Sequence, residues 1–286
     1  MTTYNTKINT PIPNRILRVI LFSFILSSIS AIVSAQGNLL ITPKRVVFEN
    51  GKRSQEMNLA NIGKDTATYM ISLIQLRMTE DGQFMAVATP DSGQLFADKN
   101  IRFFPRSVTL APNEAQSIKV QVSKSSELKP GEYRSHFYFR AVPKEKPLGD
   151  STPTAKDTTI SVHITPVFGI SMPVIIRIGE CSSKINLSDV HFDMYKDTMP
   201  SLSLVFNRSG NMSSYGDLSI DHIMPDGKTT RVGIVRGLAV YAPNARRRFH
   251  LALDKNENYH VGKLRIVYAD QSVNVLKLAE EVVVLK

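Results

Sequence analysis

The stretch ITPKRVVFENGKR, residues 41–53, decides the class of the fold. It alternates apolar and polar side chains and then breaks at Asn50-Gly51. A period of two is typical of a β-strand with one buried face, and Asn-Gly is a strong turn signal. The stretch therefore predicts a strand that ends in a tight turn. Arg45, in the middle of that strand, is a charge that an ordinary sandwich has no need for.

Similar runs continue from residue 38 to the end of the chain, at intervals of roughly 8 to 12 residues. Specific turn signals separate them, among them Asp81-Gly82, Pro130-Gly131 and Pro225-Asp226-Gly227. The final run, LKLAEEVVVL over residues 276–285, is too short and too β-branched for a helix and is expected to be the last strand. The chain is therefore predicted to be all-β.

The runs divide into two groups of similar size. About seven precede residue 178 and six or seven follow it, which predicts one immunoglobulin-like β-sandwich in each half. The boundary is expected near Ile178-Gly179-Glu180, where a hydrophobic run ends in glycine and the polar stretch CSSKINLSD follows. The expected domains are thus residues 36–178 and 179–286. Residues 143–159, with three prolines and no apolar period, predict a long flexible loop in the first domain.

The first 35 residues have the features of a cleavable signal peptide. Arg15 and Arg18 precede an uncharged apolar run over residues 19–33, and Val33-Ser34-Ala35 places small residues where a signal peptidase reads them. The alternative is a single membrane anchor, which the serines in the run and the small-residue exit disfavour. We expect cleavage after Ala35 and a mature protein without stable membrane insertion.

Net charge and cysteine content limit the partners and disulfides that this chain can have. Loss of three basic residues with the signal peptide lowers the formal net charge from +10 to +7, and export of so basic a chain argues against a nucleic-acid partner. The charge then indicates solubility, or attraction to acidic partners and membrane surfaces. Cys181 is the only cysteine, so no intramolecular disulfide can form; it is expected either to be buried or to link two chains.

Nothing in the chain indicates an enzyme. The six histidines show no H-E-x-x-H spacing, and there is no G-x-S-x-G elbow and no phosphate-binding glycine loop. We expect no cofactor. His191 and Asp193 could meet a metal, but a solvated pair is favoured. The run Arg246-Arg247-Arg248 predicts a solvated face, or else contact with an acidic partner or membrane component.

The segment after the predicted loop carries a second alternating pattern. Ile160, Val162 and Ile164 are two residues apart and would project from one face of a strand. This strand could be the last of the first sandwich, with its apolar row inward. It could instead be an edge strand that offers the row to another protein, since a long loop before a strand can keep a sheet edge open.

Several pieces of the sequence, in order, resemble one family. They are PKRVVFENGKRSQEMNLANIGK (residues 43–64), FFPRSVTLAPNEAQSIKVQV (103–122), PGEYRSHFYFRAVP (130–143) and the alternating strand that ends at Met172-Pro173. Behind a signal peptide and ahead of a second β domain, they are similar to the PapD-like periplasmic chaperones of the chaperone–usher pathway of pilus assembly. The second half matches only in length and class, so the chain would be a divergent member.

The resemblance implies a periplasmic chaperone with two immunoglobulin-like lobes in a boomerang arrangement. Such a chaperone binds and caps pilus or fimbrial subunits, which are incomplete β-sandwiches, and can deliver them to an outer-membrane usher. The donated strand would span about residues 158–170, with Ile160, Val162 and Ile164 filling the subunit's groove. The alternative that stays open is a secreted or surface β-sandwich module, adhesin-like, that binds through its loops.

The resemblance also gives Arg45 a role. In the family an arginine on the first strand and a lysine on the donor strand bind the subunit's terminal carboxylate. Arg45 matches the arginine, and a guanidinium can hold a carboxylate through two parallel hydrogen bonds. Val47 beside it is also expected to contact the subunit. The lysine position falls on Phe168, which is also expected to contact the subunit but leaves the second cation unassigned. The family's interlobe ion-pair position falls on Met172.

Overall fold

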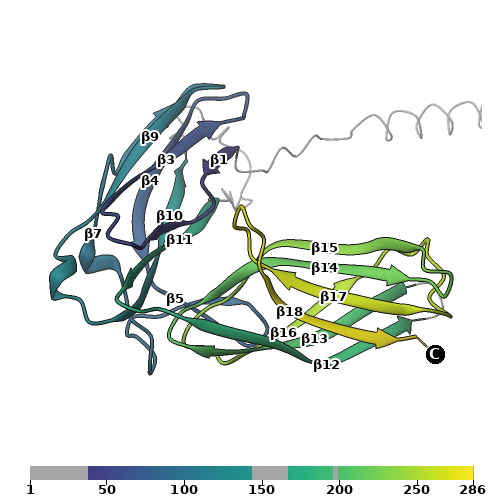
Figure 1. The fold of residues 1–286 in the computed structure, drawn as a ribbon. Coiled ribbons are helices and arrows are strands. Elements are labelled where there is room, and N and C mark those ends of the chain that lie inside the picture. The colour runs from purple at the N-terminus through teal and green to yellow at the C-terminus, as the bar shows by residue number, and fades with distance from the viewer. Residues whose placement is uncertain (1–37, 144–166, 196–198, 286) are drawn as a thin grey trace, which may run out of the picture. The chain divides into compact units, whose positions relative to one another are not determined.

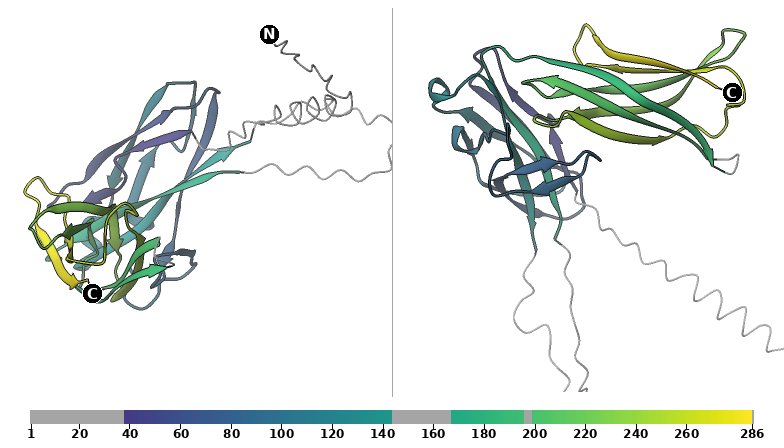
Figure 2. Two further views of the ribbon diagram at one scale, coloured as in Figure 1. Left: turned by 90° about the vertical axis from the view of Figure 1, so that its right-hand side faces the viewer. Right: turned by 90° about the horizontal axis from the view of Figure 1, so that it is seen from below.

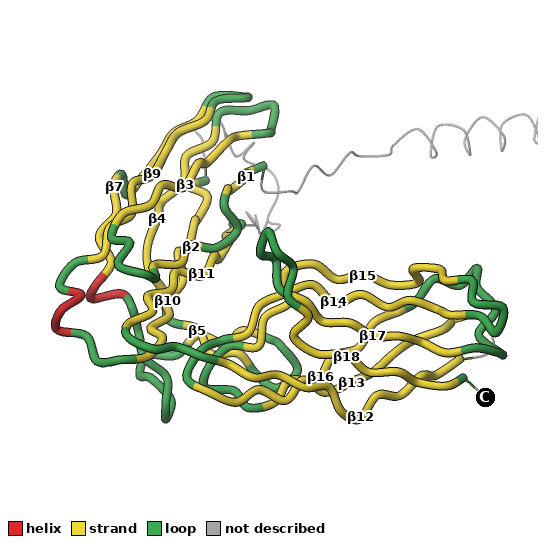
Figure 3. Tube along the Cα trace, in the orientation of Figure 1, coloured by secondary structure: helices red, strands yellow, loops and turns green. Residues whose placement is uncertain are grey.

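The structure is a computed structural model that describes residues 38–143, 167–195 and 199–285. Almost all of its regular structure is β-strand, which confirms the prediction of an all-β fold (Figure 3). The two helical elements in this part of the chain are short 3₁₀ turns, η1 (Asp98–Asn100) and η2 (Ser125–Glu127). Residues Gly37–Lys286 form one compact unit.

The strands up to residue 178 form a first sandwich of two sheets and a separate hairpin (Figures 1 and 2). One sheet has the order β1 (Leu39–Thr42), β3 (Ser54–Asn61), β9 (Ala115–Val122), β7 (Ile101–Phe104). The other has the order β2 (Val46–Phe48), β11 (Gly169–Ile178), β10 (Gly131–Val142), β4 (Ala67–Ile74), β8 (Ser107–Leu110). The hairpin joins β5 (Leu76–Met78) to β6 (Phe84–Ala86).

Two of the predicted runs are each divided between the two sheets. β1 pairs with β3 in one sheet, whereas β2 pairs in parallel with β11 in the other. The chain crosses between them at Pro43, and it crosses in the same way between β7 and β8 at Pro105. Proline has no N–H to donate to a ladder, so a strand readily stops there. The expectation that Arg45 lies in the middle of a strand is therefore wrong: Arg45 lies in the crossing segment.

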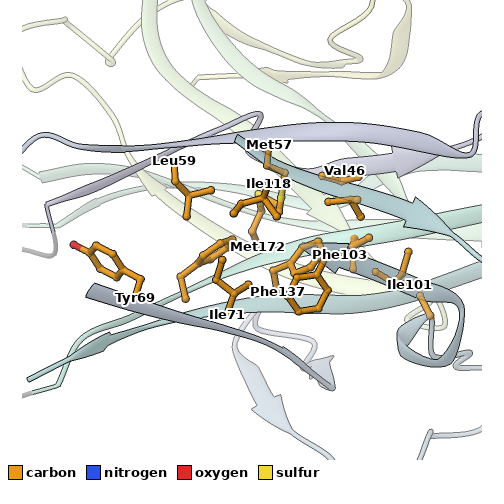
Figure 4. Close-up of a cluster of buried hydrophobic side chains, with 14 of the residues drawn as sticks. Val46, Met57, Leu59, Tyr69, Ile71, Ile101, Phe103, Ile118, Phe137 and Met172 are labelled. Atoms are coloured by element: carbon orange, nitrogen blue, oxygen red, sulfur yellow. The ribbon is translucent and has the colours of Figure 1, made fainter. Parts of the chain in front are cut away.

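The first core fills the space between these sheets (Figure 4). Phe137 on β10 is fully buried and lies edge-on to Phe103 on β7, with ring centroids 5.1 Å apart. Met172 on β11 belongs to the same core and is buried. Its place there explains why the side chain is apolar, since a charge at that position would have no solvent and no partner.

A second sandwich follows residue 182. Its smaller sheet has the order β12 (Ser183–Tyr195), β13 (Met199–Gly210), β16 (Arg246–Ala252). The larger has the order β15 (Thr229–Val240), β14 (Ser214–Ile223), β17 (Lys263–Ala269), β18 (Lys277–Val284). β18 confirms the predicted last strand. The polar stretch CSSKINLSD, which follows the expected boundary, is largely the start of β12: its apolar residues Ile185 and Leu187 pack on the second core.

Much of the predicted donor segment lies outside the described residues. This holds for the loop beyond Pro143 and for Ile160, Val162 and Ile164, so the structure describes only the end of that segment, from Val167. Among the residues that the structure describes, no helix has the length and apolar character needed to cross a membrane.

The core gives a direct test of the first sandwich. Phe137→Ala should lower the free energy of unfolding by about 3–5 kcal/mol, because a fully buried aromatic ring is replaced by a cavity. Phe104→Ala is the matched control: that ring is 77% exposed on β7 and its loss should change stability by less than about 0.5 kcal/mol. Urea denaturation of both variants measures the difference. Equal losses would contradict the placement of Phe137 in the core.

Candidate functional site

A pocket of about 530 Å³ lies beside Arg45. Residues from both halves of the chain line it, and none of them is acidic: Pro43, Lys44, Arg45, Pro173, Tyr215, Arg236, Gly237, Tyr241 and Gln271. A concave site with several cations and no carboxylate in its wall favours an anionic ligand.

Arg45 is the most buried of the pocket's cations. Its guanidinium carbon lies 4.0 Å from the centroid of the Tyr215 ring, a cation–π contact. Burial lowers the pKa of Arg45, and so does the positive charge of Arg177, but a guanidinium keeps its proton. Within the described residues, no carboxylate lies within 4 Å of the Arg45 guanidinium. The charge is thus stacked and partly desolvated, but not neutralised.

Glu132 on β10 is a buried acid whose charge acts on Arg45, and its carboxylate is already bound. Its carboxylate accepts hydrogen bonds from the Ser213 hydroxyl, from the Ser213 amide at 3.2 Å and from Arg177 Nε at 3.1 Å. Arg177 in turn pairs with Glu49 at 2.7 Å. Glu132 thus pairs with Arg177 and Ser213, and among the described residues it forms no ion pair with Arg45.

A second buried guanidinium lies behind the pocket wall. Arg134 stacks on Tyr241, with its guanidinium carbon 4.1 Å from the ring centroid. Its Nε and Nη1 have no hydrogen-bond partner among the described residues, and burial lowers its pKa. Burial also raises the pKa of Tyr241, which stays neutral. Arg45, half-buried, and Arg134, buried, therefore place two positive charges around Tyr241 and Glu132, more than one bound carboxylate can balance.

Lys44 and Arg236 are exposed at the pocket. Arg236 precedes Gly237, which has a φ of +71° and lies so close to Tyr215 that a Cβ would be 2.8 Å from its hydroxyl. The Gly237 amide donates to Asp217 Oδ1 at 2.8 Å, which fixes this part of β15. Only glycine fits this backbone and this contact. The irregular strand thus holds Arg236 at the pocket.

The predicted site residues are not all brought together. Arg45 lines the pocket, whereas Val47 is half-buried and does not line it; Val47 packs on the small apolar cluster that includes the pocket residue Tyr241. Phe168, 42% exposed, lies five residues before Pro173, a pocket residue; at about 3.3 Å per residue that is roughly 16 Å along an extended chain. The structure does not place Phe168 at the pocket.

The sequence reasoning missed Tyr215, Arg236 and Tyr241. All three lie more than 160 residues from Arg45, so no local pattern joins them to it. The one local signal was the isolated glycine at position 237 within the run TTRVGIVRGLAVY, which can mark a close backbone approach.

Other candidate groups have structural explanations. Arg248 pairs with Asp81 at 2.9 Å, its amide donates to Glu80 O at 2.7 Å, and the neighbouring Arg247 is half-buried. Arg248 therefore contacts the turn of the β5–β6 hairpin, while Arg246 pairs with Asp189 at 3.6 Å. Cys181 is half-buried as a free thiol, and burial raises its pKa. No group of three or more potential metal ligands occurs in the described ranges, those around His191 included.

No protein-family model matches the chain, and no characterised protein matches it in sequence. Among solved structures, it is similar to the complex of the CsuC chaperone with the CsuE tip subunit of archaic chaperone–usher pili of Acinetobacter baumannii (TM-score 0.42, 12% identity, 85% of this chain and 99% of that one). It is also similar to the Escherichia coli chaperone DraB (0.41, 11%, 87% and 96%). A third is the Salmonella enterica SafA pilin–SafB chaperone complex (0.39, 12%, 87% and 97%).

Burial of His136 beside Tyr241 predicts an acid sensitivity. Burial, and then the charge of Arg134, lower the pKa of His136 to about 3, against about 6.5 in an unfolded chain. Between these values the unfolded chain binds more protons, so stability should fall as the pH drops, by up to about 1.4 kcal/mol per pH unit. His136→Phe keeps an aromatic ring against Phe84 and Tyr241 and should flatten this dependence.

Urea denaturation at several pH values between 4 and 7 measures the slope. His260→Asn serves as the control for loss of a histidine, because His260 is exposed. The same slope in the wild-type protein and in His136→Phe would show that His136 does not titrate as its burial requires.

Proposed function

We propose that this protein is a periplasmic chaperone that binds and caps pilus or fimbrial subunits before their assembly. The observation that carries the proposal is Arg45: a half-buried, stacked guanidinium without a carboxylate partner in the described residues, in an open pocket without acidic lining. Such a site fits the terminal carboxylate of a polypeptide, which needs a charge-assisted donor in a desolvated position. The order of sequence pieces that resembles PapD-like chaperones supports the same function.

Arg236 is proposed as the second cation of the carboxylate site. The position that the family resemblance assigns to a lysine holds Phe168, which lies away from the pocket. Arg236 lines the pocket from β15 and is held there by the Gly237–Asp217 hydrogen bond. The anchor would then combine a half-buried cation from the first sandwich with an exposed cation from the second.

The donor strand completes the proposal. We assign it to about residues 158–170, with Ile160, Val162 and Ile164 entering the subunit. Strand addition draws affinity from backbone hydrogen bonds and specificity from alternate side chains. Support comes from the alternation itself and from Pro173, which lies at the pocket a few residues further along the same segment. A chain end held at Arg45 could thus continue as a strand beside this segment.

Arg45→Ala should weaken capture of the subunit by about 2–5 kcal/mol, mainly through faster dissociation, because a charged hydrogen bond to a desolvated carboxylate is lost. Arg236→Ala should mainly slow association and reduce its dependence on salt, since Arg236 is exposed. The tagged full-length chain is purified from the native periplasm, co-purifying polypeptides are identified by mass spectrometry, and their rebinding kinetics are measured. The N-terminus of the purified chain, expected at Gln36, tests export in the same preparation.

Arg102→Ala is the matched control, since Arg102 is an exposed arginine on β7 outside the pocket. It should bind like the wild type. If no small β-rich polypeptide co-purifies, or if Arg45→Ala and Arg102→Ala retain it equally, the proposed chaperone function fails at this site.

The donor strand has its own test. Val162→Ser with Ile164→Ser should remove about 3–6 kcal/mol of binding, because two aliphatic side chains no longer enter the subunit. The pair Ser161→Ala and Thr165→Ala, of opposite parity, should bind normally. Thermal melting without a partner distinguishes a donated strand from a strand that belongs to the protein's own core. A large drop in melting temperature for the Val162, Ile164 variant would show that these residues fill the protein's own core.

A further inference from the structure

The segment between β17 and β18 exposes three apolar side chains to solvent. In the sequence Asp270-Gln-Ser-Val-Asn-Val-Leu276, Val273 is fully exposed, Val275 is 66% exposed and Leu276 is 62% exposed. We call this segment, residues 270–276, the β17–β18 loop (Figure 1). Isolated exposed apolar residues are common, but three within four positions form a patch that a soluble surface usually avoids unless it binds something.

The base of this loop is closed by hydrogen bonds. The Asp270 amide donates to Leu276 O at 2.9 Å, and Asp270 Oδ1 accepts from the Leu276 amide at 2.7 Å. This amide, with the Ser272 hydroxyl, lowers the pKa of Asp270, so the carboxylate is ionised and the closure is in place at neutral pH. The loop therefore holds its valines outward on a fixed base, which reduces the entropy that a partner would have to remove.

The loop is joined to the Arg45 pocket through one carboxylate. Asp217 Oδ1 accepts from Gln271 Nε2 at 2.5 Å and from the Gly237 amide at 2.8 Å. Gln271 and Gly237 both line the pocket, next to Arg236. Val273 is two residues beyond Gln271, at most about 7 Å along the chain. The apolar loop and the cationic pocket are thus neighbouring parts of one surface.

We propose that the β17–β18 loop is a second contact for the subunit whose chain end occupies the pocket. The inference rests on the proposed function and adds to it an apolar surface on the second sandwich. The occupant would be a polypeptide with an anionic end and an apolar flank beside it. A second copy of this chain fits less well, because the exposed Lys44 and Arg236 of two such surfaces would face each other with like charge.

Site-specific photocrosslinking tests the contact. A benzoylphenylalanine at position 273 should crosslink to the same polypeptide that co-purifies with the wild-type protein and is lost with Arg45→Ala. The control is the same probe at Lys228, an exposed position in the turn at the opposite end of β14 from Tyr215. Crosslinking at 273 and not at 228 supports the loop contact. Crosslinking to a second copy of this chain, or to nothing, overturns it.

A binding measurement completes the test. Replacement of Val273, Val275 and Leu276 by serine should weaken rebinding of that purified polypeptide by about 10- to 100-fold without lowering the melting temperature. Val284→Ser, a single exposed valine at the far end of β18, should change neither quantity. Equal rebinding by the loop variant overturns the loop contact while leaving the chaperone function intact. Failure of the wild type to capture any polypeptide overturns both.

Sedimentation with vesicles of phosphatidylglycerol and phosphatidylcholine tests membrane binding as the alternative, because a basic, apolar surface also suits an anionic membrane. The wild type and the loop variant should sediment with them equally little. Loop-dependent sedimentation without crosslinking to the polypeptide would assign the patch to lipid and overturn the proposal.

Discussion

The bound carboxylate of Glu132 determines the chemistry of the pocket. It is buried and shared by Ser213 and Arg177, yet its charge acts on four guanidinium groups, those of Arg45, Arg134, Arg177 and Arg208. A single buried carboxylate cannot pair with all of them, so positive charge remains at the pocket. A desolvated positive charge without a partner is costly. A ligand that supplies an anion would reduce that cost.

Two aromatic side chains stabilise this excess positive charge. Tyr215 stacks on Arg45 and Tyr241 on Arg134, and a cation over a ring face gains electrostatic energy without being neutralised. Asp217 organises the other side of the pocket, where it binds both the Gly237 backbone and Gln271. The pocket therefore has a stacked interior and a hydrogen-bonded edge, and both are present before any ligand binds. Preorganisation of this kind lowers the entropy cost of binding.

The class of fold could be predicted because it follows from local rules: a period of two, turn dipeptides and no helical period. Strand switching at Pro43 and Pro105 could not, since the sheet that a strand joins depends on distant partners. Arg45 was found through the resemblance of its surroundings to a family. Tyr215, Arg236 and Glu132 were not, because their importance comes from contacts with residues far along the chain. Val273 and Val275 precede the predicted last strand, and only the structure shows that they stay exposed in a loop before β18.

The central claim is that the pocket recognises a terminal carboxylate. The most direct test compares two synthetic peptides with the C-terminal sequence of the co-purifying polypeptide, one with a free carboxylate and one with a C-terminal amide. Isothermal titration should give a dissociation constant about 30- to 1000-fold lower for the free acid, since loss of a charged hydrogen bond costs about 2–4 kcal/mol. Equal affinities for the acid and the amide would contradict the account.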